Sequence, residues 1–302
     1  MPRFFKLIIN ILCLAALLIL CQKVWAQEWQ PVRGGIPFGI SGIALLGQQN
    51  NSLEFLIVHD NKQKNQSRLA TIKIQGKNAP EYLPLNWQNN LALPIDLEAL
   101  TSIPKSSNSF IAFASSGKAY HLKLQPTNKT ISVIKEFSLS NIPPESNFEA
   151  FALQDIDNKL VAVWAHRGEA EQPAIIYWGT LDLQKYQITT LGAANFTVPF
   201  PLGNVRHISD LKIDSAGIVY VTSASDAGDD GPFQSAVYVA GYVGWSGNKL
   251  VWRQSSQLVP LHRSDYHKIE GMELVPGIAG GLIVGTDDEN FGSYVYMVGG
   301  SN

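Results

Sequence analysis

Cysteine is almost absent from this chain of 302 residues. Its two cysteines, Cys13 and Cys21, both lie near the N-terminus, so no disulfide bond can connect distant parts of a fold. Helical periodicity is also lacking, because apolar residues alternate in short runs that Gly, Asn, Ser and Pro interrupt. Such alternation is typical of β-strands. A large all-β core must therefore stabilise the protein without covalent cross-links.

One long apolar run is present, and it lies at the N-terminus. Arg3 and Lys6 precede an apolar stretch at residues 7–20, and the small residue Ala26 follows. This order is typical of a secretory signal peptide, and the run is shorter than the roughly 20 residues that a membrane-spanning helix needs. We therefore predict a signal peptide at residues 1–26, cleaved after Ala26.

Residues 27–302 are then expected to form one extracytoplasmic domain, either secreted or periplasmic, with no stable insertion in a membrane. No Pro- and Gly-rich linker divides this part of the chain. A lipoprotein with acylated Cys21 is an alternative, but the bulky Leu20 stands where lipidation signals carry a small residue.

The sequence has no excess of basic residues. Without Arg3, Lys6 and Lys23 of the predicted signal peptide, 20 basic residues face 25 acidic ones, a formal charge of −5. A nucleic-acid partner is therefore not expected, since such proteins carry basic patches. The sequence gives no indication of an oligomeric state.

A repeated motif runs through the rest of the chain. In each copy an acidic or hydroxyl residue follows an apolar one, and a second apolar residue comes two places later. The five copies lie at residues 39–45, 96–102, 147–153, 207–213 and 268–274. Their marker residues, separated by 57, 51, 60 and 61 positions, are Ser41, Glu98, Glu149, Ser209 and Glu270.

Two further strand-like runs follow every marker, and a third follows all but the last. Four strands in about 50 to 60 residues predict one propeller blade per repeat. Residues 28–33 form a strand-like segment with no repeat of its own, and they can supply the missing strand of the fifth blade. We predict an all-β, five-bladed β-propeller closed by its N-terminal strand; a β-sandwich or two small β-domains are the alternatives.

The markers are predicted to lie on the innermost strands, where they would meet as a ring. Three carboxylates in a narrow channel repel one another unless a cation or a proton intervenes. Oxygen ligands favour a hard ion, so Ca²⁺ is the expected cofactor. In a second interpretation there is no metal, and Lys268 and His207 neutralise the glutamates.

The turns near the expected channel mouth carry further polar residues. Arg167, Arg206 and Lys268 are candidates to bind phosphate oxygens, because charged donors bind such oxygens well. Asp60 and Asp287 are candidates for a general base. These five residues form the predicted catalytic set, and a small phosphorylated molecule is the predicted ligand.

The order Ser, Glu, Glu, Ser, Glu resembles the central calcium site of the secreted calcium-activated nucleotidases, or apyrases, which are five-bladed propellers. The resemblance rests on the motifs at residues 40–42, 97–100, 148–150, 208–212 and 269–273. It implies that Ser41, Glu98, Glu149, Ser209 and Glu270 bind Ca²⁺ and that nucleoside di- or triphosphates are hydrolysed.

Residues 147–151, 268–272 and 285–291 are similar also to the phytase-like exported propellers of bacteria, which are linked to phosphoester chemistry. The expected function is thus that of a calcium-dependent phosphohydrolase. The alternative is a non-catalytic exported propeller that binds a ligand or protein at its rim, since one fold hosts many functions.

Overall fold

The computed structural model describes residues 28–49, 52–88, 91–125, 130–140, 142–143, 146–277 and 281–299. The predicted signal peptide lies outside these residues, and so does its predicted cleavage site. Within them, no helix has both the length and the apolar character that a bilayer crossing requires.

The described chain forms five antiparallel sheets. Four of them have their main strands in chain order, and in the fifth the first strand of the chain, β1, lies at the edge beside the last strand, β21. Blade 1 contains β2 (Gly42–Gln49), β3 (Ser52–Val58), β4 (Leu69–Gln75) and β5 (Glu81–Leu85). Blade 2 contains β6 (Leu97–Ser102), β7 (Ser109–Ala114), β8 (Lys118–Gln125) and β9 (Thr130–Ser138). Blade 3 contains β10 (Phe148–Ile156), β11 (Lys159–His166), β12 (Ala174–Asp182) and β13 (Gln187–Phe196). Blade 4 contains β14 (Val205–Ile213), β15 (Ile218–Ser225), β16 (Ser235–Ser246), β17 (Lys249–Gln254) and β18 (Pro260–Ser264). Blade 5 contains β19 (Ile269–Val275), β20 (Gly281–Thr286), β21 (Ser293–Val298) and β1 (Gln30–Arg33).

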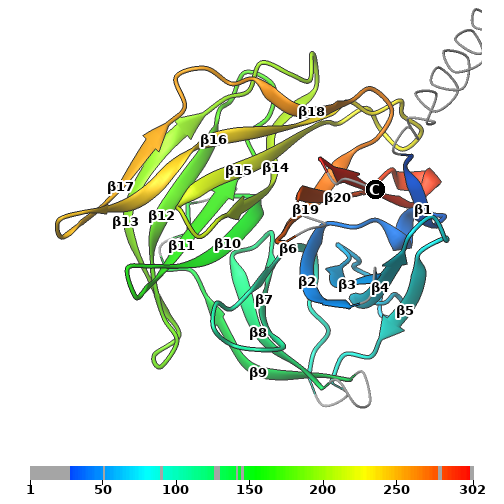
Figure 1. Cartoon of the computed structure of the whole chain (residues 1–302), viewed down its shortest axis with the longest axis horizontal. Coiled ribbons are helices and arrows are strands. Elements are labelled where there is room, and N and C mark those ends of the chain that lie inside the picture. The colour runs from blue at the N-terminus through cyan, green and yellow to red at the C-terminus, as the bar shows by residue number, and fades with distance from the viewer. Residues whose placement is uncertain are drawn as a thin grey trace, which may run out of the picture.

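The five innermost strands meet around a common centre (Figure 1). Strand β2 contacts β6, β6 contacts β10, β10 contacts β14, β14 contacts β19, and β19 returns to β2. This closed order is that of a five-bladed propeller, as predicted. It excludes the β-sandwich and the two-domain alternative.

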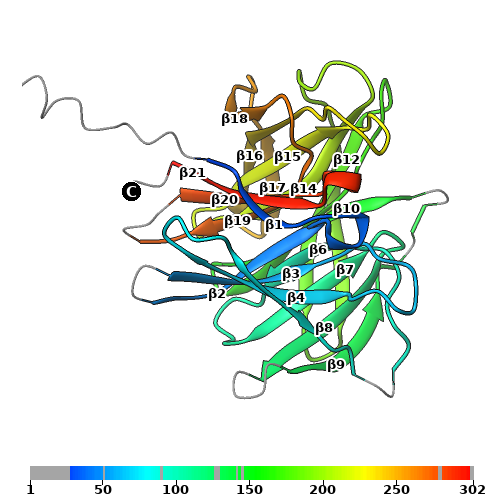
Figure 2. The same ribbon diagram turned by 90° about the vertical axis from the view of Figure 1, so that its right-hand side faces the viewer.

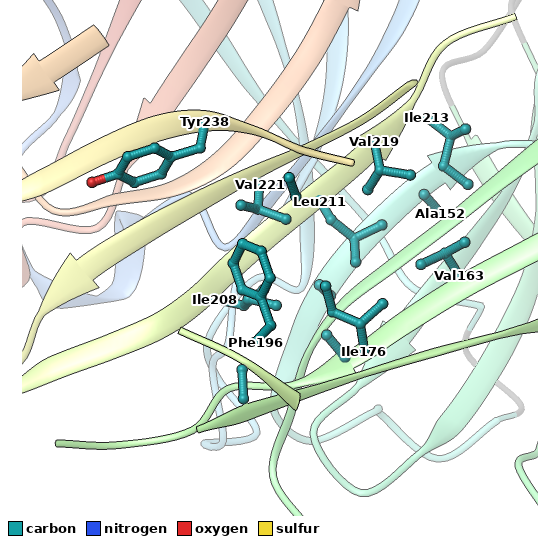
Figure 3. Packing of buried hydrophobic residues seen from close by; sticks show 14 of the residues in the cluster. Ala152, Val163, Ile176, Phe196, Ile208, Leu211, Ile213, Val219, Val221 and Tyr238 are labelled. Atoms are coloured by element: carbon teal, nitrogen blue, oxygen red, sulfur yellow. The ribbon is translucent and has the colours of Figure 1, made fainter. Parts of the chain in front are cut away.

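Apolar side chains fill the space between neighbouring blades. The cluster between blades 3 and 4 includes Val163 and Ile176 from one sheet and Leu211, Val221 and Tyr238 from the other, all nearly inaccessible to solvent (Figure 3). Such packing between sheet faces follows from strand alternation, which directs every second side chain towards the next blade. It provides the large core that a protein without disulfides requires.

Strand β1 completes blade 5 and joins the two ends of the ring (Figure 2). It runs antiparallel to β21, with Gln30 opposite Val295 and Pro31 opposite Tyr294. Just before it, the ring of Trp29 lies 4.3 Å from that of His267 and 5.0 Å from that of Tyr296. The predicted closure by residues 28–33 is therefore confirmed.

Blade 4 departs from the expected four strands. Strand β16 is twelve residues long, and its outer edge is shared by two short strands. Its second half pairs with β17, and its first half pairs with β18. The sequence did not predict β18, since its residues Pro260–Ser264 include a proline, a histidine and an arginine and lack the apolar alternation of a buried strand. As an edge strand it needs little of that pattern.

The innermost strands approach one another closely at Gly42. A Cβ atom added there would lie 2.7 Å from the backbone nitrogen of Leu100 in blade 2. Only glycine fits such a contact without displacing backbone. The innermost strands of blades 1 and 2 are consequently in close backbone contact at this position.

Replacing Trp29 by Ala tests the closure. Loss of the ring contacts with blade 5 is expected to lower the free energy of unfolding by about 2 kcal/mol, less than for a fully buried tryptophan. Urea unfolding measures this change. Ile134→Ala on strand β9, where the side chain is 52% exposed, is the control and should cost less than about 0.5 kcal/mol. Equal stability of Trp29→Ala and the wild type would contradict the proposed role of this segment.

Candidate active site

A pocket of about 120 Å³ lies at the centre of the ring. Every residue that lines it is polar, and all but Asn147 carry a charged group. The acidic residues are Asp60, Asp96, Glu98, Glu149, Glu270, Asp287 and Glu289. The basic residues are Lys62, Arg167, Arg206 and Lys268. The pocket is therefore a concentrated set of charges with an excess of acid.

Three glutamates reach this pocket because each lies at an irregularity of its innermost strand. The pairing register shifts across Glu98, across Glu149 and across Glu270, so each glutamate is left out of the ladder. A β-bulge of this kind re-aims a side chain. The repeated motif thus encodes a bulge whose acidic residue turns into the channel.

The two serine markers are placed differently. Ser209 donates a hydrogen bond to the carbonyl of Ile269 at 2.7 Å and lies 2.9 Å from the hydroxyl of Thr222. The Ser41 hydroxyl is buried and has no hydrogen-bond partner among the described residues. Neither serine lines the pocket. The structure thus brings together the three glutamates of the predicted calcium ring and leaves the serines outside their pocket.

Two of the three glutamates are paired with cations. Arg206 Nη1 lies 2.8 Å from Glu270 Oε1, and Lys268 Nζ lies 3.2 Å from the same oxygen. Arg167 Nη1 lies 3.5 Å from Glu149 Oε1. The acidic neighbours raise the pKa of Lys268 despite the opposing effect of burial. These cations partly compensate the carboxylates on that side of the pocket.

Each of these three basic residues also forms an ion pair with a second acidic residue. Arg206 also binds Asp226 at 2.7 Å, Arg167 binds Glu169 at 2.9 Å, and Lys268 binds Glu289 at 2.5 Å. Sequence reasoning identified the cations, but it did not predict these partners because they lie in loops outside the repeated motif.

His207, the other suggested partner of the glutamates, has a different role. It accepts a hydrogen bond from the backbone of Val198 at 3.3 Å and contacts the carbonyl of Ala170 at 2.9 Å. It does not line the pocket. The pairing of Lys268 with a glutamate, expected in the second interpretation, is thus present, and the other cation beside Glu270 is Arg206 and not His207.

The acidic side of the pocket lacks such compensation. Asp60, Asp96 and Glu98 each offer an oxygen, and these three oxygens lie within 4.8 Å of one another. Asp60 and Glu98 form neither a hydrogen bond nor an ion pair among the described residues. Burial, followed by the Glu270 and Asp96 carboxylates, raises the pKa of Asp60 to about 6. Burial and Glu149 raise the pKa of Glu98 well above its usual value.

Asp96 supports this cluster through its position before β6. Its backbone is left-handed with φ of 64°, and its two carboxylate oxygens contact Ser115 at 2.6 Å and Lys62 at 2.8 Å. Lys62 is 58% exposed and can leave at low cost. Three oxygens with no firmly held cation suit a hard divalent ion. The oxygens of Asp60, Asp96 and Glu98 therefore form a donor set that fits Ca²⁺. Of the predicted ring of five, this set contains Glu98 alone.

A second polar group, formed by Asp210 and Lys212, is buried in the core. Lys212 Nζ donates to the carbonyl of Leu100 at 2.7 Å and lies 3.5 Å from Asp210, which accepts from the backbone of Met272 at 2.8 Å. Burial raises the pKa of Asp210 to about 7 against the opposing effect of Lys212. These bonds join blades 2, 4 and 5. They could not be predicted from the sequence, because Asp210 and Lys212 flank an apolar residue as exposed strand residues often do.

No known protein-family profile matches the sequence, and no curated protein matches it either. Solved structures do match. An endo-1,4-beta-xylanase from Bacteroides thetaiotaomicron has a TM-score of 0.52 and 11% identity, over 89% of this chain and 92% of that one. An endo-arabinase from the same organism has a TM-score of 0.50 and 10% identity, over 89% and 98%. A thermostable family-43 glycoside hydrolase has a TM-score of 0.50 and 11% identity, over 89% and 91%.

Identity this low establishes a common fold and nothing finer. The three named structures are glycoside hydrolases, and none is a calcium-activated nucleotidase or a phytase-like propeller. They support the five-bladed fold that the resemblance implied. They do not support the calcium-dependent hydrolysis of phosphate compounds that the resemblance also implied. By its fold, the chain is a five-bladed β-propeller similar to glycoside hydrolases.

The buried acids predict an unusual pH dependence in metal-free protein. Burial raises the pKa of Glu149 to about 7, with Arg206 opposing the shift. A carboxyl group whose pKa is raised by folding stays protonated in the folded state at pH values at which it has already lost its proton in the unfolded state. The contribution of these carboxyl groups to the free energy of unfolding should therefore fall as pH rises from about 5 to 8.

Urea unfolding in EDTA at pH 5, 6, 7 and 8 measures this fall, and Glu149→Gln should make it shallower. Glu136→Gln on strand β9, away from the pocket, is the matched control and should leave the slope unchanged. A slope for Glu149→Gln equal to that of the wild type would contradict a raised pKa of Glu149 in the native state.

Proposed function

We propose that this protein is a metal-assisted hydrolase that acts on a phosphoester. One observation carries the proposal: a wholly polar pocket in which a three-carboxylate cluster lies with two partly buried arginines. The cluster suits a divalent cation, and the arginines suit the oxygens of an anion. The pocket is smaller than the 300–1,000 Å³ typical of sites that enclose drug-sized ligands. It therefore suits a phosphate group rather than a whole substrate.

Asp60, Asp96 and Glu98 would hold the cation. When bound, a cation of this kind polarises a phosphoryl oxygen and lowers the pKa of a water molecule. Arg167 would bind a phosphate oxygen, since its side chain is 19% exposed and only one of its two carboxylate contacts is short. Arg206 is less available, because both of its terminal nitrogens form short ion pairs. Its role would be to keep Glu270 in place.

Asp287 suits a proton donor better than the general base expected from the sequence. Burial, followed by the Glu270 carboxylate, raises its pKa well above the usual value. A protonated carboxyl group can give its proton to the leaving oxygen of the substrate. Lys268 lies 3.8 Å from Asp287 and would orient it.

Glycoside hydrolysis is a second candidate, favoured by the solved structures with this fold. That chemistry uses one protonated and one ionised carboxyl group, and Glu149, with a pKa near 7, could be the acid. The lining argues against it, because it contains no aromatic or apolar residue to contact the apolar face of a sugar ring. A non-catalytic propeller with a structural ion is the third candidate.

Calcium binding distinguishes the two ligand sets. At a Ca²⁺ concentration of 100 times Kd, the ion should stabilise the wild type by about 2.7 kcal/mol. Asp60→Asn and Glu98→Gln should lose most of this gain, whereas Ser209→Ala should keep it. Thermal unfolding with Ca²⁺ and with EDTA measures the effect. A gain that depends on Ser209 and not on Asp60 would support the ring of five instead.

Activity tests the chemistry itself. Purified protein should release phosphate from nucleoside diphosphates or aryl phosphates with Ca²⁺ and not with EDTA. Arg167→Ala should lower kcat/KM about 100-fold, the loss typical of one charge-stabilising donor, and Arg253→Ala on the exposed face of β17 should change it little. Release of sugar from aryl arabinosides or xylosides, without phosphate release, would establish the second candidate. Stabilisation by Ca²⁺ without activity on either panel would establish the third.

A further inference from the structure

A second pocket of about 370 Å³ lies beside the central one and differs from it in character. Aromatic rings and a proline form much of its lining, together with His267 and two aspartates. Tyr266 is 76% exposed and Phe291 is 56% exposed. Exposed rings that flank a cavity are costly to solvate and provide flat surfaces for another ring.

His267 gives this pocket a directed hydrogen-bond acceptor. Its Nδ1 lies 2.5 Å from Asp288 Oδ2. Asp288 also accepts from the backbone nitrogen of Lys268 at 2.6 Å and from the hydroxyl of Thr286 at 3.0 Å. Because Asp288 accepts all three of these hydrogen bonds, the imidazole ring of His267 carries a proton on Nδ1. In the neutral imidazole, Nε2 then has no proton and is a hydrogen-bond acceptor.

Nε2 of His267 has no hydrogen-bond partner in the part of the chain that the structure describes. The ring is held in place by Trp29 at 4.3 Å and Tyr294 at 4.8 Å between ring centres. Asp230, which also lines the pocket, accepts from Asn290 at 2.9 Å and adds a second acceptor. Both polar groups are hydrogen-bond acceptors, so the pocket favours a ligand that carries an O–H or N–H donor.

The two pockets share a wall. His267 and Lys268 are neighbours in sequence, as are Asp288 and Glu289, and each residue of one pair contacts one of the other. Lys268 and Glu289 line the central pocket, while His267 and Asp288 line the aromatic one. The two pockets are thus separated by these two pairs of residues.

We propose that the aromatic pocket binds the planar ring of the substrate, and that an O–H or N–H group on this ring donates to His267. Ring binding follows from the pocket alone. The link to a phosphate in the central pocket rests on the proposed function. The substrate class is then a phosphoester whose leaving group carries a planar ring with a hydrogen-bond donor.

Phenol and its methyl ether anisole test the ring site without any chemistry. Both present the same ring, but only phenol can donate to His267. Titrations followed by NMR should give phenol a lower Kd than anisole. His267→Phe keeps a ring beside Trp29 and should remove this preference. Tyr266→Ala and Phe291→Ala should raise both Kd values about three- to tenfold, whereas Leu202→Ala, at an exposed position outside the pocket, should change neither.

Equal affinity for phenol and anisole in the wild type, or no effect of Tyr266→Ala and Phe291→Ala, would overturn the ring site. Turnover of 4-hydroxyphenyl phosphate and methyl phosphate then tests the link, and the aryl ester should have the lower KM in the wild type but not in Tyr266→Ala. Phenol binding with no turnover of either ester would contradict the proposed function and leave the ring site standing. Turnover of both esters with equal KM would contradict the link alone.

Discussion

The ring of blades brings several carboxylates together at its centre. The fold depends on groups that offset the repulsion between their negative charges. Bulges on three innermost strands turn Glu98, Glu149 and Glu270 into one narrow channel. Two like charges a few ångströms apart repel by several kcal/mol at an effective dielectric constant of about 20. The blades can converge only if protons, cations or a bound ion offset this repulsion.

The chain itself offsets only part of it. Arg167 and Arg206 enter from blades 3 and 4 and pair with Glu149 and Glu270. On the side of blades 1 and 2, Glu98 has no such partner, and the pKa values of the carboxyl groups there are raised. This asymmetry gives the pocket an arginine side suited to an anion and a carboxylate side suited to a cation. The proposed phosphoester chemistry needs both.

The fold could be predicted because it repeats. Five marked segments with alternating apolar runs define the blades, and residues 28–33 have no other place than the open edge of blade 5. The site could be predicted only in part. The alternation of side chains along a strand gives no information about β-bulges or about the loop residues that pair with the cations. The glutamates and the cations that sequence reasoning singled out line one pocket, but the hydrogen bond from the Ser209 hydroxyl to the backbone of blade 5 was not predicted. Asp288, which orients His267, lies in a loop that carries no repeated signal.

A crystal structure of the protein soaked with a lanthanide ion that replaces Ca²⁺ tests the central claim most directly, because anomalous scattering locates such an ion without assumptions about its ligands. The account predicts one strong peak in the central pocket, within bonding distance of Asp60, Asp96 and Glu98. A peak shared by Ser41, Ser209 and Glu270, or no peak in the pocket at all, would contradict it.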